Sequence, residues 1–274
     1  NKIIPSIKGE YIILTPSHSS LKEYKKKKFN CQVIQKYEYK PELFKNKTII
    51  VDEIGMVNYK GMINIYLWSV LGNKIYCYGD FNQLLPVGRE TPLNTNIFIK
   101  STFSTIKEMD TNYRNHFTRQ FYDECIEGEV NKKELILKYL NNENSNNVCA
   151  YTNKTCQKYN DIISKKLGHD NIFSVGAKLI CNTNELRSLG MYNKFIYEVK
   201  EVKEESIILD DGTEILKKDC LKKEGKKDYL SFGYARTLHS YQGESIKDLY
   251  YPIEEIDFLN DRAFYTLISR LKTK

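Results

Sequence analysis

The chain has 274 residues, which is enough for two modest domains that each bury a core. Its formal net charge of +7 is compatible with a polyanionic partner, although a basic balance alone does not establish one. No apolar run approaches the roughly 18 residues of a membrane-spanning helix, and no secretory signal is visible. We therefore expect no transmembrane segment and no membrane partner.

The seven cysteines form no C-x-x-C pair, and their number is odd. This pattern argues against a zinc site or a disulfide framework and favours a reduced, intracellular compartment, the cytoplasm or the nucleus. Lysine outnumbers arginine 35 to 7, a bias typical of AT-rich coding, as in some large DNA viruses and microbes. Where lysine is the default cation, an arginine next to a motif suggests that guanidinium geometry is needed.

The first half of the chain alternates short apolar runs with helical patterns. Continuously apolar runs that end in polar residues are typical of buried parallel strands, and their alternation with helices predicts a parallel α/β sheet. The lysine-rich run of the first helix is most simply a solvated face, and phosphate contact is the alternative. We expect strands at 11–15, 31–34, 48–51 and 74–78, and helices at 21–28 and 62–71.

The second half shows another alternating set, interrupted by a β-rich segment. Asp211-Gly212 is a hairpin turn signal between alternating stretches, so residues 187–230 are predicted to form a small β insertion. Around this insertion we expect helices at 117–138, 155–167, 235–241 and 258–271, and strands at 148–151, 177–181, 230–233 and 249–252.

An acidic pair, Asp52-Glu53, directly follows the apolar run 49–51. In a parallel α/β sheet ligands bind at the carboxyl ends of the strands, and Thr15, Asp52, Glu53 and Asp80 all fall there. One carboxylate can hold Mg²⁺, usually through water, and the other can orient or deprotonate an attacking water. For this pair in isolation an acidic surface turn is the simpler interpretation. Together with the next motif, the nucleotide-binding interpretation is favoured.

The most informative stretch follows the next strand and reads Gly79-Asp80-x-x-Gln83-Leu84-x-Pro86-Val87. Asp80 and Gln83 lie beyond the strand end, where they can sense a γ-phosphate, and Pro86 fixes the exit of the loop. The alternative is a polar turn between two strands. Chance occurrence of this long pattern downstream of an acidic strand end is small.

Three later stretches carry further candidate groups. Tyr113-Arg114 offers an arginine that can reach a γ-phosphate from a domain junction. The segment 234–245 brings Thr, His, Gln and Gly to a strand-to-helix turn, which can offer amides and side chains to phosphates. The segment 265–270 ends in Arg270, about one helical turn beyond Tyr265. For each stretch a surface arginine, a capped helix or a solvated helix end is the simpler alternative.

Taken in order, these motifs resemble the series of superfamily 1 helicases, most closely the RecD-like and Pif-family branch that includes the phage Dda type. The resemblance runs from about residue 11 to 271. It implies an α/β fold of two RecA-like parallel-sheet domains, the P-loop NTPase fold. The first domain is expected at 1–115 and the second at 116–274, with a small β-barrel-like insertion at about 187–230.

The resemblance also gives each motif a role. Asp52 is expected to hold Mg²⁺, Glu53 to activate water and Gln83 to sense the γ-phosphate. Arg114 and Arg270 are expected to stabilise the charge that develops there. The remaining residues fall into an ATP-coupling group and a nucleic-acid-binding group. The first group is Gly79, Asp80, Gln242, Gly243 and Tyr265, and the second is Thr15, Pro16, Ser17, His18, Thr237, His239 and Tyr241.

Two departures from the family pattern stand out. Ser240-Tyr241 replaces the usual Lys-Ser or Lys-Ala pair after the motif histidine, so Tyr241 either stacks on a base or packs internally. No G-x-x-x-x-G-K-[ST] phosphate loop occurs anywhere in the chain. Because the chain begins with Asn1 rather than Met, we expect a longer protein that is truncated here just after its phosphate-loop helix. A degenerate loop in the full protein is the alternative.

The expected function of the parent protein is ATP-dependent 5′→3′ translocation on single-stranded DNA with unwinding at duplex junctions, in viral or cellular DNA replication or repair. ATP and Mg²⁺ are the expected cofactors, and this chain alone is expected to hydrolyse ATP very poorly. A viral RNA helicase of the same superfamily is one alternative. An inactive helicase-like protein that only binds nucleic acid is another, and fusion to a primase, nuclease or polymerase is a third.

Overall fold

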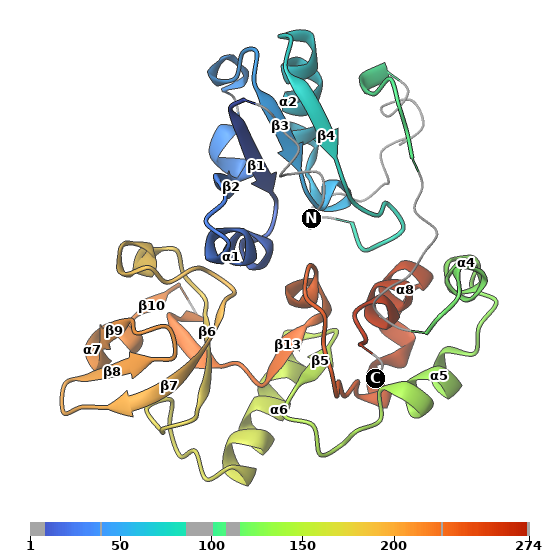
Figure 1. Ribbon diagram of the computed structural model, residues 1–274. Helices are drawn as coiled ribbons and strands as arrows, with labels where there is room; N and C mark the ends of the chain where they lie inside the picture. The colour runs from blue at the N-terminus through green and yellow to red at the C-terminus, as the bar shows by residue number, and fades with distance from the viewer. Residues whose placement is uncertain (1–8, 39, 86–100, 108–115, 226, 273–274) are drawn as a thin grey trace. The chain divides into compact units, whose positions relative to one another are not determined.

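The computed structural model describes residues 9–38, 40–85, 101–107, 116–225 and 227–272. The chain divides into two compact units, whose elements are labelled in Figure 1. Unit 1 comprises Asn1–Gly128 and Asp261–Thr266, and unit 2 comprises Glu129–Asn260 and Leu267–Lys274. The division falls after Gly128, and the segment 261–266 joins the first unit. The domain boundary expected at 115 lies outside the described residues and stays a prediction.

Unit 1 is built on a four-stranded parallel sheet in the order β2-β1-β3-β4. Its strands are β1 (Tyr11–Thr15), β2 (Cys31–Val33), β3 (Thr48–Val51) and β4 (Lys74–Cys77), so all four predicted strands are confirmed to within one residue. Leu14, Val51 and Cys77 lie side by side in the register. The residues that follow them therefore leave the sheet at a single edge.

Two helices of unit 1 begin three residues before their predicted starts. Ser17 caps α1 (His18–Lys26) and Asn58 caps α2 (Tyr59–Val70), because each side chain accepts a backbone N–H of the first turn. Apolar side chains of α2, among them Trp68, pack in one cluster with those of β1 and β3. Short 3₁₀ turns complete this part: η2 (Ile34–Tyr37), η3 (Pro41–Leu43) and η4 (Ile54–Met56).

The single helix predicted over 117–138 is wrong, because two helices occupy this stretch. They are α4 (Arg119–Glu127) and α5 (Lys132–Tyr139). Gly128 ends α4 in the left-handed region at φ 77°, and Asn131 caps the start of α5. A glycine that ends one helix and an asparagine that starts the next are the usual signals of such a break.

Unit 2 contains a parallel pair of strands, β5 (Val148–Ala150) and β13 (Ala235–Thr237), covered by α6 (Asn153–Lys166). Strand β5 and helix α6 confirm two predictions. The helix predicted at 235–241 is wrong, because these residues form β13 and the 3₁₀ turn η6 (Leu238–Tyr241). The strand predicted at 249–252 is reduced to isolated bridges of Tyr250. The chain continues through η7 (Ile253–Phe258) to α8 (Asp261–Ser269).

Unit 2 also contains a five-stranded antiparallel sheet in the order β12-β6-β7-β8-β9 and a separate two-stranded sheet, β10-β11. The five-stranded sheet confirms a β insertion, but it begins at Lys178, before residue 187. The run 177–181, which was expected to belong to the parallel set, pairs antiparallel with both neighbours because its buried residues belong to the core of the insertion. The elements are β6 (Lys178–Cys181), η5 (Glu185–Leu189), β7 (Ile196–Val202), β8 (Ser206–Leu209), β9 (Glu214–Leu216), α7 (Lys217–Cys220), β10 (Lys223–Glu224), β11 (Lys227–Asp228) and β12 (Leu230–Phe232).

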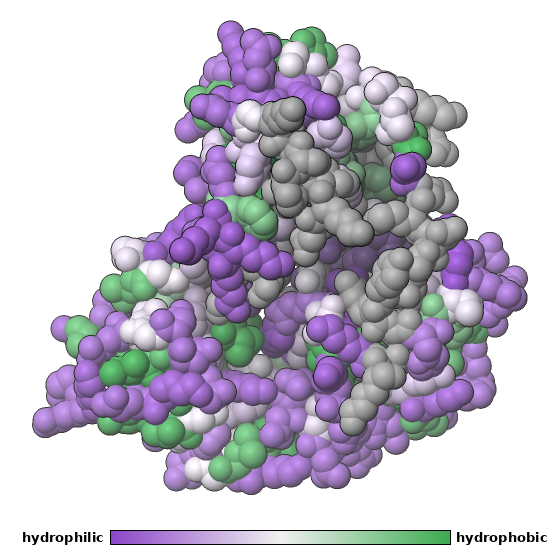
Figure 2. Space-filling model, in the orientation of Figure 1, coloured by the Kyte–Doolittle hydropathy of each residue, from purple (hydrophilic) through white to green (hydrophobic). Residues whose placement is uncertain are grey.

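Charged residues dominate the exposed end of α1. Lysines 25–28 are exposed, and Figure 2 shows hydrophilic side chains over this helix. No helix in the described ranges combines the length and apolar character that a membrane crossing requires. All seven cysteines are free thiols, and six of them are buried.

Candidate functional site

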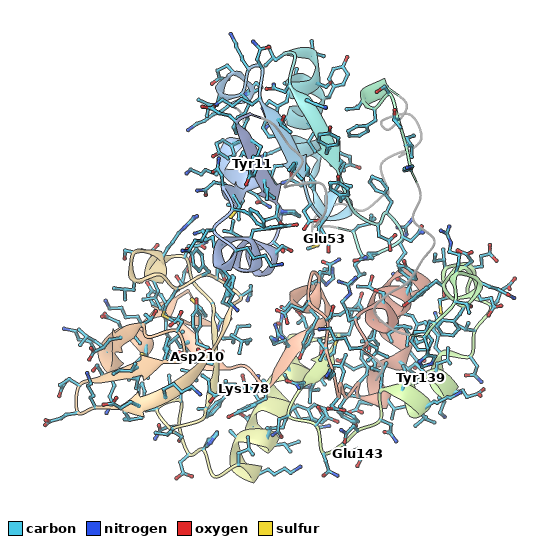
Figure 3. The ribbon with its side chains drawn as sticks, viewed as in Figure 1. Tyr11, Glu53, Tyr139, Glu143, Lys178 and Asp210 are labelled. Carbon is cyan, nitrogen blue, oxygen red and sulfur yellow. The ribbon has the colours of Figure 1, made fainter. Side chains whose placement is uncertain are left out.

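The acidic pair lies where the parallel register places it, at the carboxyl edge of the unit 1 sheet. Asp52 donates its backbone N–H to the carbonyl of Leu14 at 2.9 Å, which continues the ladder one residue past β3. Glu53, labelled in Figure 3, takes the left-handed conformation at φ 56° and turns the chain into η4. The predicted position of both carboxylates at a strand end is thus confirmed.

Asp52 is partly buried and held by two donors. The Tyr24 hydroxyl donates to its Oδ2 at 2.8 Å, and the backbone amide of Glu53 also donates to the carboxylate. Burial raises the pKa of Asp52 above its usual value, and these two hydrogen bonds only partly oppose this effect. A cation beside this carboxylate is therefore favourable. Tyr24 lies in the lysine-rich helix and was not expected at the site.

Close backbone packing joins the acidic turn to the loop that follows β4. A Cβ atom on Gly55 would lie 2.3 Å from the carbonyl oxygen of Asp80, and one on Gly79 would lie 2.7 Å from the backbone nitrogen of Ile54. The Ile54 N–H also donates to the carbonyl of Tyr78 at 2.9 Å. Gly79 was expected to couple to ATP, and its position shows a packing reason for glycine. Gly55 has the same reason and was missed.

Asp80 organises the loop at 80–84. Its Oδ1 accepts the backbone N–H of Asn82 at 2.9 Å, and its Oδ2 accepts Gln83 Nε2 at 3.3 Å and the Tyr265 hydroxyl. Gln83 is 8% exposed, and its Oε1 is buried without a hydrogen-bond partner among the described residues. This oxygen can accept a hydrogen bond from a water or from a ligand that carries a donor group.

The first turns of α8, which belong to unit 1, hold the same loop. Arg262 donates through one guanidinium nitrogen to the carbonyl of Phe81 at 2.5 Å and to that of Gln83 at 3.5 Å. Thr266 Oγ1 accepts the backbone N–H of Leu84 at 2.8 Å. Arg262 was not predicted, although it is one of only seven arginines in a lysine-rich chain, and that rarity could have identified it.

The motif after β1 is built as a helix cap. Thr15 is fully buried, and its Oγ1 accepts the backbone N–H of Ser17 at 3.4 Å. Ser17 Oγ in turn accepts the backbone N–H of Ser20 at 3.2 Å. Pro16 is partly exposed, and the His18 side chain lies outside the described part of the structure. The hydroxyl of Thr15 therefore supports the turn, and Pro16 is left at its surface.

The segment 234–245 of unit 2, called the late motif below, contains both exposed and buried residues. Thr237 is partly exposed, with its Oγ1 3.0 Å from Ser240 Oγ, and His239 keeps more than a third of its surface exposed. Neighbouring atoms that displace water from the imidazole lower the pKa of His239 below its usual value. Gly243 takes the left-handed conformation at φ 82°, and Gln242 is 3% exposed.

Tyr241 is held inside unit 2 at 1% exposure. Its hydroxyl donates to the carbonyl of Val148 at 3.2 Å, and the Arg236 guanidinium lies 4.0 Å from its ring centroid. Arg236 also makes two hydrogen bonds to the Glu244 carboxylate, at 3.0 and 2.8 Å. This geometry favours internal packing over base stacking for Tyr241. Arg236 and Glu244 were not predicted as a pair.

The two predicted charge-stabilising arginines have different outcomes. Arg114 lies outside the described residues. Arg270 belongs to unit 2, is 1% exposed and donates through two guanidinium nitrogens to Ser269 Oγ at 3.1 and 3.3 Å. Tyr265 belongs to unit 1 and, besides its bond to Asp80, packs edge-on against Tyr122.

The donor set at the sheet edge suits a magnesium ion that keeps most of its water. The described residues contain no group of three His, Cys, Asp or Glu side chains that could cage a metal. Mg²⁺ is usually bound through one or two carboxylates together with water and substrate phosphates. Asp52, whose charged form is disfavoured by burial, fits that role as a single ligand.

The architecture matches that of solved structures, whereas the sequence comparisons find no relative. No protein-family model and no curated protein sequence matches the chain. A structure of two coordinating Pif1 helicases at forked double-stranded DNA superposes with a TM-score of 0.68 at 16% identity, over 99% of this chain and 82% of that one. Bacteroides Pif1 bound to single-stranded DNA gives 0.65 at 16% identity, over 99% and 83%.

The Pif1 helicase of Candida albicans gives a TM-score of 0.55 at 13% identity, over 98% of this chain and 90% of that one. At such low identity the likeness establishes the fold. The predicted fold class and the resemblance to the Pif-family branch are thereby confirmed at the level of architecture. The chain has the fold of the Pif1 helicases, with RecA-like parallel sheets and a small β insertion in the second unit.

Proposed function

We propose that the chain belongs to an ATP-dependent DNA helicase that translocates 5′→3′ on single-stranded DNA and opens duplex junctions. One observation carries the proposal. Within unit 1, the edge of one parallel sheet gathers Asp52, Glu53, the Asp80 carboxylate and the unsatisfied Oε1 of Gln83. The fold likeness to Pif1 helicases bound to single-stranded and forked DNA supports it.

In this proposal each group at the edge has a defined task. Asp52 holds Mg²⁺, mostly through water, and the metal supplies charge for the phosphates of ATP. Glu53 accepts a proton from the attacking water. Gln83 Oε1 accepts a hydrogen bond from the same water and so positions this water. Asp80, Tyr265 and Arg262 fix the Gln83 loop, since all three contact it in unit 1.

ATP turnover by the chain as it stands is expected to be very low. Its 274 residues contain no G-x-x-x-x-G-K-[ST] sequence. In enzymes that have this loop, it supplies the backbone cradle and the lysine for the β- and γ-phosphates. Robust steady-state hydrolysis by purified residues 1–274 would contradict this part of the proposal.

Nucleic-acid binding can be tested without ATP. Fluorescence anisotropy with labelled DNA and RNA strands of equal sequence, over a series of salt concentrations, measures affinity, preference and salt slope. We expect tighter binding to single-stranded DNA than to its duplex, with an affinity that falls as salt rises. Absence of salt-dependent binding refutes the DNA-binding part, and tighter binding to RNA indicates an RNA helicase instead.

The catalytic assignment needs a form of the protein that carries a phosphate loop together with these residues. In that form Glu53→Gln is expected to leave ATP binding largely intact and to abolish turnover. Near-normal hydrolysis by the variant removes Glu53 from the role of base. Unwinding of forked duplexes with either a 5′ or a 3′ tail then tests polarity.

A further inference from the structure

Unit 2 presents one exposed aromatic pair. The rings of Tyr151 and Phe258 stack with their centroids 5.6 Å apart and their planes 22° apart. Tyr151 is 37% exposed and Phe258 is 52% exposed, and no other Phe or Tyr in the described part of unit 2 is as exposed. Because the stack is offset and half in water, part of each ring remains open to a further planar group.

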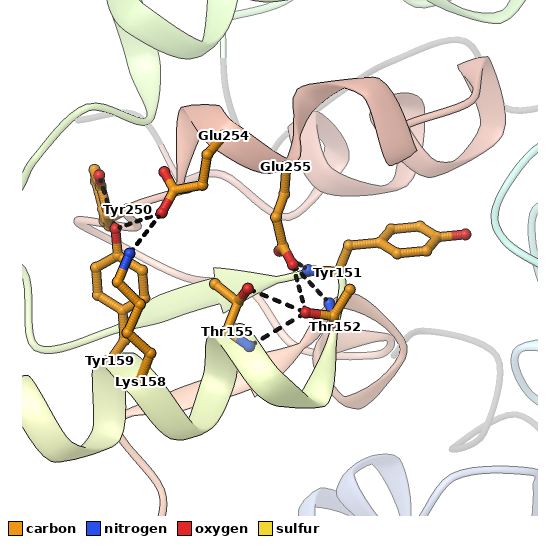
Figure 4. A network of polar contacts seen from close by, with 8 residues as sticks. All are labelled: Tyr151, Thr152, Thr155, Lys158, Tyr159, Tyr250, Glu254 and Glu255. Atoms are coloured by element: carbon orange, nitrogen blue, oxygen red, sulfur yellow. Dashed lines mark hydrogen bonds and ion pairs between the residues drawn. The ribbon is translucent and has the colours of Figure 1, made fainter.

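A buried carboxylate joins the two chain segments that carry the pair. Glu255 is 2% exposed, and its Oε2 accepts the backbone N–H of Tyr151 at 2.5 Å (Figure 4). Its Oε1 accepts the backbone N–H and the hydroxyl of Thr152 at 3.1 and 2.6 Å. Phe258 lies three residues after Glu255 on the same turn, η7. The backbone segments that carry the two rings are thus tied together before any ligand arrives.

The pair lies at the same sheet edge as the exposed part of the late motif. Strands β5 and β13 run parallel with Ala150 opposite Thr237, and Tyr151 follows Ala150 directly. Neighbouring strands are about 4.8 Å apart, so Tyr151 leaves the sheet beside the turn that carries His239. Glu255 accepts the amides of Tyr151 and Thr152, the two residues that precede α6, and Thr152 caps the helix through the amide of Thr155.

We propose that the Tyr151–Phe258 pair is a stacking platform for a base of single-stranded DNA. The proposal rests on the proposed function, because it needs a strand that crosses the carboxyl edge of β5 and β13. Aromatic side chains that stack on bases tolerate any sequence, since every base has a π-face. A pre-ordered pair also spares the entropy of ordering side chains on binding. The platform adds affinity without adding charge.

Anisotropy with a single-stranded DNA tests the platform in residues 1–274. Tyr151→Ala and Phe258→Ala are expected to weaken binding about 5- to 100-fold, the range for loss of one stacked base. Tyr151→Phe keeps the ring and is expected to bind like the wild type. Tyr66→Ala removes another exposed tyrosine, on α2 in unit 1, and serves as the matched control.

Two readouts separate stacking from other causes of weaker binding. A strand that carries 2-aminopurine is expected to lose fluorescence on binding to the wild type and to Tyr151→Phe, and to keep it with Tyr151→Ala. The slope of log affinity against log salt is expected to stay the same in all variants, because no phosphate contact is removed.

The outcomes are distinct for the two proposals. If the wild type binds single-stranded DNA and both alanine variants bind equally well without a change in 2-aminopurine signal, the platform is refuted and the proposed function stands. If Tyr151→Ala lowers the salt slope, the contact is electrostatic and the platform is refuted. If the wild type does not bind at all, both proposals fail. Should an alanine variant not fold, the wild-type 2-aminopurine signal still decides.

Discussion

Glu255→Gln is the substitution whose effect the structure defines best. The carboxylate uses both oxygens, one for the Tyr151 amide at 2.5 Å and the other for the Thr152 amide and hydroxyl. Glutamine has a single acceptor oxygen, and its NH₂ group would face one of these donors. The variant thus loses one charge-assisted hydrogen bond, worth about 1.5–3 kcal/mol, and weakens the others because the charge is gone. We expect a total loss of about 2–4 kcal/mol.

Glu254→Gln is the matched control at the neighbouring position. Glu254 pairs with Lys158 at 3.0 Å, and the two side chains are 45% and 58% exposed, so its loss is expected to change stability by about 0–1 kcal/mol. Urea unfolding of both variants is followed by far-UV circular dichroism, because the single tryptophan lies in unit 1 and does not report on unit 2. If Glu255→Gln unfolds within about 0.5 kcal/mol of Glu254→Gln, the carboxylate does not anchor this turn in the way described.

Three further predictions concern the two units separately. Gly55→Ala is expected to destabilise unit 1 by about 1–3 kcal/mol, because its Cβ would meet the Asp80 carbonyl at 2.3 Å, and an unchanged tryptophan-monitored urea transition would refute this. Tyr24→Phe removes the hydroxyl that donates to ionised Asp52, so the variant is expected to raise the Asp52 pKa further. The stability difference between the variant and the wild type should be largest at neutral pH and should shrink in acid, as the carboxylate becomes protonated. The lowered pKa of His239 means that the unfolded chain binds this proton more readily than the folded chain does. Stability should therefore decline as the pH falls below about 6.5, and His239→Gln should lessen that decline in pH-dependent thermal unfolding.

Sequence periodicity predicted the parallel half of unit 1 almost completely, for a physical reason. Short apolar strands buried on both faces leave a continuous signal, and the polar residues at their carboxyl ends mark the ligand-binding edge. The positions of Asp52 and Glu53 at that edge followed from this periodicity. The groups that the sequence did not reveal, Tyr24 and Arg262, act through contacts with residues distant in sequence. No local pattern carries that information.

The second unit was harder to predict because local and tertiary preferences compete there. The run 178–181 is as apolar as a parallel strand, yet it pairs antiparallel inside the β insertion, and periodicity does not distinguish the two. Residues 235–237 have a helical continuation in sequence but form a strand, because Val148–Ala150 offers them a parallel partner. Tyr241 left two interpretations open, and only its burial favours packing.

The left-handed backbone of Glu53 has a consequence for how this chain has been selected. A residue with a side chain in this region costs about 1–2 kcal/mol relative to glycine, which adopts φ 56° without strain. Selection for thermal stability alone would therefore be expected to replace Glu53 with glycine or asparagine. If the proposed role of Glu53 holds, the carboxylate justifies this backbone cost. Two parallel library screens, one for folding and one for ATP turnover in a form with a phosphate loop, should diverge first at this position.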